Sequence, residues 1–124
     1  MDPKPRRPFS FVKRAKSVGH AFSGIRKFLR AEHNGWLHLT ATAGVLLLAL
    51  VVRVTVTEAV ELTIAVGLVW SAEMFNCALE KLIDFIHPGL DPQLGFIKDV
   101  AAGSVLVASL IALVIGLLIF LPKL

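Results

Sequence analysis

The chain has 124 residues, of which 56% are apolar and 18% charged, and its mean hydropathy is +0.74. Soluble domains average about half apolar and about a quarter charged residues, so the composition indicates a membrane protein and excludes a disordered chain, a collagen and a coiled-coil rod. The formal net charge is +4, and nine of the 13 Lys and Arg residues lie within the first thirty positions. This concentration favours a membrane surface over nucleic acid as the partner of the basic residues.

The N-terminal segment divides into a flexible basic stretch, residues 1–10, and a predicted amphipathic helix, residues 11–32. Apolar residues recur in this helix at steps of three and four, which places them on one face at the helical period. They are Phe11, Ala15, Val18, Phe22, Ile25 and Leu29. With its lysines on the opposite side, the helix is expected to lie in the membrane interface. The alternative is a soluble helix packed against a partner.

Residues 33–124 are predicted to form an all-α membrane domain with three spans. The apolar runs cover about 36–52, 59–84 and 96–121, and each is close to the roughly 17 to 25 residues that cross a bilayer. Short polar connections separate the runs, and Pro88, Gly89 and Pro92 interrupt the helix in the second connection. Because Lys and Arg stay on the cytoplasmic side, we expect the N-terminus and the second connection inside the cell.

The second run carries an unusual set of polar residues for a membrane span. Glu73, Asn76, Glu80 and Asp84 follow one another at steps of three, four and four, which places them on one helix face within an arc of about 80°. Ionisable groups inside spans usually mark a functional path or a partnered site. This set is called the polar stripe below, and its three carboxylates predict a cation as partner.

A metal and a polyanion are one interpretation of the stripe. If the second and third spans pack antiparallel, Lys98 and Asp99 come to its inner end, where Glu32 also lies by its position before the first span. Carboxylate oxygens without competing nitrogen or sulfur ligands suit Mg²⁺, which binds proteins together with substrate phosphates. Structural interpretations stay open for single residues, because Glu73 could be a protonated carboxyl bonded to a neighbouring helix and Asn76 could link two helices. His33, His38 and His87 lack metal-ligand spacing.

The same residues carry a resemblance to a known family. The run Glu73-Met-Phe-Asn-Cys-Ala-Leu-Glu80, then Asp84 and Lys98-Asp-Val-Ala-Ala-Gly103, is similar to the signature of the prokaryotic diacylglycerol kinases. The similarity extends over about residues 17–124, and it includes Gly24, Glu32, Asn34 and His38. The residues before Ser17 have no counterpart.

The resemblance implies a homotrimeric membrane lipid kinase of three-span subunits, with composite active sites near the cytoplasmic face of a bacterial inner membrane. It implies ATP as co-substrate and Mg²⁺ as cofactor. Carried over by position, Glu80 is expected to be the catalytic base, and Glu32 and Glu80 the metal ligands. Nucleotide binding or site geometry is expected from five further residues, which are Glu73, Asn76, Asp84, Lys98 and Asp99.

The acceptor is expected to be undecaprenol rather than diacylglycerol. His38 stands where diacylglycerol-specific relatives usually have an acidic residue, and the run Val100–Gly103 and the ending Leu121–Lys123 are similar to the undecaprenol kinases. Leu90-Asp91 replaces the Tyr-His pair that is common in relatives, and Phe85 follows Asp84 where an Arg or Leu-type residue is common.

A small proton- or ion-coupled transporter is the alternative from another class, with Glu73 and Glu80 as carrier carboxylates. A non-catalytic oligomeric membrane protein is a third. A transporter predicts a polar path that continues to the outer face, yet the second run beyond Glu73 holds Val66, Gly67, Leu68 and Val69.

Overall fold

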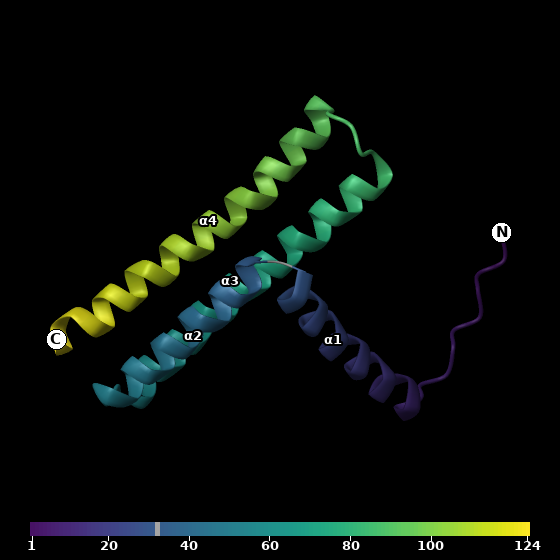
Figure 1. The fold of residues 1–124 in the computed structure, drawn as a ribbon. Coiled ribbons are helices and arrows are strands. Elements are labelled where there is room, and N and C mark those ends of the chain that lie inside the picture. The colour runs from purple at the N-terminus through teal and green to yellow at the C-terminus, as the bar shows by residue number, and fades with distance from the viewer. Residues whose placement is uncertain (32) are drawn as a thin grey trace. The chain divides into compact units, whose positions relative to one another are not determined.

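The computed structural model describes residues 1–31 and 33–124, and these residues form four α-helices and a short 3-10 turn, with no strand among them. The helices are α1 (Phe11–Ala31), α2 (His33–Val51), α3 (Val56–Ile86) and α4 (Pro92–Phe120), and η1 covers Leu121–Lys123 (Figure 1). The prediction of an all-helical protein is confirmed. Glu32, an expected metal ligand, lies outside the described residues.

The chain divides into two compact units, Met1–Trp36 and Leu37–Leu124. In the first unit the predicted helix is present as α1, and the side chains of its apolar face are largely exposed, with Phe11 at 80% and Phe22 at 68%. Its place in a membrane interface stays a prediction.

In the second unit, α3 and α4 run side by side in opposite directions (Figure 1). Two ion pairs mark the two ends of this helix pair. Lys98 contacts Asp84 at one end, and Lys123 Nζ lies 3.1 Å from Glu58 Oε2 at the other. The prediction that Lys98 lies near the polar stripe assumed that the second and third spans pack antiparallel. This packing is present.

In the part of the chain that the structure describes, two helical segments are long and apolar enough to cross a bilayer, Val56–Ile86 and Pro92–Lys123. They correspond to the second and third predicted spans. Within the described residues a third span is obtained only when α1 and Gly35–Val51 are taken together as one broken span, so a separate first span at 36–52 stays a prediction. The small buried core between α2, α3 and α4 is centred on Leu62, Ile119 and Phe120.

Local sequence signals explain where the spans begin. Thr55 caps α3 by accepting a hydrogen bond from the Glu58 backbone N–H, and the Glu58 carboxylate accepts one from the Thr55 backbone N–H. Asp91 caps α4 by accepting from the backbone N–H groups of Gln93 and Leu94, and Pro92 occupies the first turn. Both caps satisfy N–H groups that a helix leaves free at its start, so the two connections are fixed by short-range chemistry.

Arg53 ends α2 in a conformation that normally favours glycine. Its φ is 55°, and the Val54 N–H donates to the Ala49 carbonyl, as in a Schellman motif with its left-handed residue at Arg53. A side chain in this conformation costs about 1–2 kcal/mol. We therefore expect Arg53→Gly to raise the thermal unfolding temperature of the purified protein. Arg53→Ala keeps the Cβ atom, so an equal rise in both variants would contradict this explanation.

Candidate functional site

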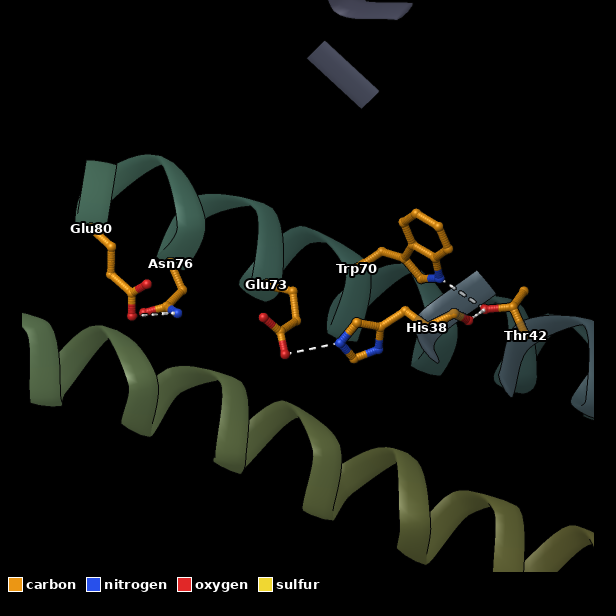
Figure 2. A network of polar contacts seen from close by, with 6 residues as sticks. All are labelled: His38, Thr42, Trp70, Glu73, Asn76 and Glu80. Atoms are coloured by element: carbon orange, nitrogen blue, oxygen red, sulfur yellow. Dashed lines mark hydrogen bonds and ion pairs between the residues drawn. The ribbon is translucent and has the colours of Figure 1, made fainter. Parts of the chain in front are cut away.

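The polar stripe lies on α3, and the helix is continuous from Val56 to Ile86. Because the helix is continuous, residues spaced by three and four positions lie on a single face, and no kink rotates one half of the helix against the other. Figure 2 shows Glu73, Asn76 and Glu80 extending from the same side of α3 toward α4. The predicted alignment of these three side chains is thus observed.

Asn76 and Glu80 form a hydrogen-bonded pair within the stripe. Asn76 Nδ2 donates to Glu80 Oε1 at 3.2 Å, which fixes the carboxylate one turn away along the helix. Asn76 Oδ1 is buried and has no hydrogen-bond partner among the described residues. A buried oxygen without a donor is costly, so this atom marks a place where a donor or a cation would stabilise the structure.

The Asp84 end of the stripe meets α4 at Lys98. Lys98 Nζ donates to Asp84 Oδ1, and the two side chains are 37% and 61% exposed. An ion pair this exposed contributes at most about 1 kcal/mol to stability. The ammonium group is thus available to a bound anion at little cost to the fold. Asp99, the next residue of α4, is exposed.

The other end of the stripe contacts α2. His38 Nε2 and Glu73 Oε1 are 2.9 Å apart, and their side chains are only 17% and 12% exposed. Beside this contact, Trp70 Nε1 donates to Thr42 Oγ1 at 2.8 Å. Thr42 Oγ1 donates to the His38 carbonyl at 2.7 Å, so four residues of α2 and α3 form one polar network (Figure 2).

Sequence reasoning assigned His38 no partner in the stripe. Residues equally far from a short connection lie at the same level in an antiparallel hairpin, but this rule does not pair His38 with Glu73. His38 lies 13 residues before the end of α2, and Glu73 lies 17 residues after the start of α3, so the contact had no clear signal in the sequence. The open interpretation of Glu73 as a carboxyl bonded to a neighbouring helix agrees with the observed contact.

An apolar groove of about 660 Å³ lies between α2, α3 and α4. Its polar lining is confined to one end, at His38, Thr42, Trp70 and Ser109. The rest is lined by aliphatic and small residues and by Phe120, down to Leu124. The groove therefore offers no row of ionisable side chains leading away from Glu73, as a transporter would need.

Within the described ranges, no three His, Cys, Asp or Glu side chains are grouped as a metal site. The donor chemistry of the stripe nevertheless fits Mg²⁺, since Glu80 and the unpaired Asn76 oxygen are adjacent hard ligands. Mg²⁺ commonly takes one or two protein carboxylates and completes its shell with phosphate oxygens and water. The arrangement can thus hold a metal-bound phosphate group between a carboxylate and Lys98.

Comparisons with known proteins agree with this chemistry. The model of the prokaryotic diacylglycerol kinase family matches residues 19–120. The undecaprenol kinase of Bacillus subtilis (strain 168) is 38% identical over 109 residues, which cover 88% of this chain and 89% of the relative. The diacylglycerol kinase of Synechocystis sp. is 28% identical over 109 residues, and the aligned segment spans 62% of that relative.

No solved structure matches the chain significantly. The family match covers most of the sequence and includes the whole polar stripe with Lys98 and Asp99. The chain therefore belongs to the prokaryotic diacylglycerol kinase family and is a membrane lipid kinase that uses ATP.

Proposed function

We propose that this kinase transfers the γ-phosphate of ATP to the hydroxyl of undecaprenol, with the polar stripe of α3 as its active site. The main support for this site is the ion pair between Asp84 and Lys98. This pair places Lys98, the only lysine near the start of α4, beside the face of α3 that carries the acidic side chains. The acceptor is supported by the 38% identity to an undecaprenol kinase over nearly the whole chain.

Phosphoryl transfer needs positioning and charge neutralisation more than covalent help from the protein. Lys98 offsets negative charge on the transferred group, and Asp84 and Asp99 orient the lysine and the nucleotide. Asn76 and Glu73 fix the geometry of the site. The chain has no glycine-rich phosphate loop of the G-x-x-x-x-G-K-[ST] or G-x-G-x-x-G type, so these side chains hold the phosphates.

Glu80 is the proposed catalytic base. The hydroxyl oxygen of the acceptor forms a bond to the γ-phosphorus, and the bond from that phosphorus to the bridging oxygen of ADP breaks. The hydroxyl proton passes to the Glu80 carboxylate, and ADP leaves. The hydrogen bond from Asn76 holds one carboxylate oxygen, which leaves the other to take the proton.

Glu80 and Glu32 are the proposed ligands for Mg²⁺. When bound, the ion supplies positive charge to the phosphates of ATP. Glu80 supports this proposal together with its neighbour Asn76, whose buried side-chain oxygen accepts no hydrogen bond from any described residue.

The proposed enzyme lies in the inner membrane of a bacterium, with the N-terminus and the site on the cytoplasmic side, where ATP is present. The basic, amphipathic α1 is proposed to lie in the interface against anionic head groups. We further propose a homotrimer whose sites are shared between subunits, which would cover part of the exposed apolar surface of α3 and α4.

The acceptor is tested by competition. Purified protein with ATP and Mg²⁺ is given undecaprenol and diacylglycerol at equal mole fraction in the same micelles, and the phosphorylated lipids are separated and counted. We expect undecaprenyl phosphate as the main product. Phosphatidic acid as the main product would instead support a diacylglycerol kinase, as the Synechocystis relative suggests. If neither lipid is phosphorylated, the proposed function is wrong, and ion transport becomes the next test.

A further inference from the structure

Among the described side chains of α2, His38 contacts the polar stripe. Its Nε2 atom lies 2.9 Å from Glu73 Oε1, and both side chains are largely shielded. The imidazole and the Trp70 indole also lie close, with ring centroids 6.4 Å apart. His38 therefore has a defined position, in contact with Glu73 of α3 and at the polar end of the groove.

The backbone at His38 is fixed independently of its side chain. Trp70 donates to Thr42, and Thr42 donates to the His38 carbonyl. This second link joins the same turn of α2 to α3 through two hydrogen bonds in which the Glu73 carboxylate takes no part. The structure thus separates two tasks, since Thr42 and Trp70 hold the helices together while His38 holds a carboxylate.

The hydrogen bond to His38 determines the direction in which the Glu73 carboxylate points. Figure 2 shows His38 on one side of the Glu73 carboxylate and Asn76 with Glu80 on the other. With Oε1 engaged by His38, the carboxylate is held with Oε2 available to the part of the site that contains Asn76 and Glu80. Without this bond, the flexible side chain of Glu73 could adopt several rotamers, and its charge would be spread over several positions.

The distances along α3 match this role. Asn76 is displaced from Glu73 by about 4.5 Å along the helix axis and from Glu80 by about 6 Å. An alcohol held near Asn76 would thus lie between the two carboxylates, with Glu80 as base on one side and Glu73 as hydrogen-bond acceptor on the other. The Glu73 carboxylate can assist the reaction only if it keeps this orientation, because small misplacements of groups in an active site reduce rates strongly.

We propose that His38 is a positioning residue of this lipid kinase, which orients the Glu73 carboxylate toward the acceptor alcohol through the bond between His38 Nε2 and Glu73 Oε1. This inference rests on the proposed kinase site and adds to it a residue from α2. A merely structural role for His38, as a link between α2 and α3, is the competing explanation, since polar side chains commonly join helices in membranes.

The test compares three variants of the full-length protein with the wild type. His38→Ala removes the donor, His38→Gln keeps an N–H donor on a side chain of similar reach, and Thr42→Val removes the other link at the same junction. For each protein, kcat, the KM for ATP, the KM for undecaprenol and the unfolding temperature are measured.

For a positioning residue, His38→Ala is expected to lower kcat by about 10- to 100-fold and to leave the KM for ATP within about twofold of the wild type. His38→Gln is expected to restore most of the lost kcat. Thr42→Val is expected to lower the unfolding temperature as much as His38→Ala and to keep most of kcat. This pattern separates orientation of Glu73 from helix packing.

Two results would overturn the inference. One is an unchanged kcat in His38→Ala, and the other is an equal loss of kcat in His38→Ala and Thr42→Val without recovery in His38→Gln. Both presuppose an active wild type, so they leave the proposed function intact. A wild type that phosphorylates no lipid would contradict the proposed function itself, and with it the role of His38.

Discussion

Glutamine in place of Glu80 is expected to lower kcat for lipid phosphorylation by about 10³-fold or more. The substitution keeps the size of the side chain and the oxygen that accepts the hydrogen bond from Asn76, so the local structure should persist. It removes the group that is proposed to take the acceptor proton, and such proton transfer alone contributes about 10²- to 10⁴-fold in typical enzymes. The measurement is the initial rate of phosphate transfer at saturating ATP and lipid.

The two proposed roles of Glu80 can be separated by titrating Mg²⁺. A lost metal ligand raises the Mg²⁺ concentration needed for half of the maximal rate, whereas a lost base lowers the rate at saturating Mg²⁺. Glu61→Gln is the matched control, because Glu61 is exposed on the same helix and lies far from the stripe residues. Wild-type turnover in Glu80→Gln would exclude both roles, and an equal loss in Glu61→Gln would indicate a general effect on the helix.

The second large effect is expected at Lys98. Lys98→Met removes the cation that contacts the Asp84 end of the stripe, and a single group that stabilises transition-state charge is typically worth about 10²- to 10³-fold in rate. We therefore expect kcat/KM for ATP to fall by about that factor. The thermal stability should change little, because the pair with Asp84 is substantially exposed.

Lys123→Met provides the control for this variant. Lys123, in the η1 turn that follows α4, also pairs with a carboxylate of α3, but at the opposite end of that helix. Both variants thus remove one ammonium group and one ion pair to α3. If Lys123→Met reduced kcat/KM as strongly as Lys98→Met, the loss would reflect helix packing, and the proposed role of Lys98 in charge neutralisation would be wrong.

The fold was largely predictable because its elements are long and their boundaries are local. The spans follow from apolar length, and the caps at Thr55 and Asp91 are set by residues within three positions of each helix start. The first span was harder to predict from the sequence. The helix α2 is only 19 residues long, and the charged residues beside it do not mark where a membrane begins. Arg53 in a left-handed conformation was not predicted, since arginine carries no signal for it.

The site was predictable where it depends on one helix and less so where it depends on two. The alignment of Glu73, Asn76 and Glu80 follows from helical spacing alone. The approach of Lys98 to Asp84 needed only the assumption of antiparallel packing. The contact between His38 and Glu73 depended on the register of α2 against α3, which a histidine among apolar residues does not reveal.

The most direct test is the fate of the labelled γ-phosphate of ATP when the purified wild-type protein, Mg²⁺ and undecaprenol are combined in micelles. A kinase with the proposed site should place the label in chloroform-extractable undecaprenyl phosphate, at a rate that depends on all three additions. Label that appears only as inorganic phosphate, or stays in ATP with every lipid alcohol offered, would contradict direct transfer from nucleotide to lipid at the polar stripe.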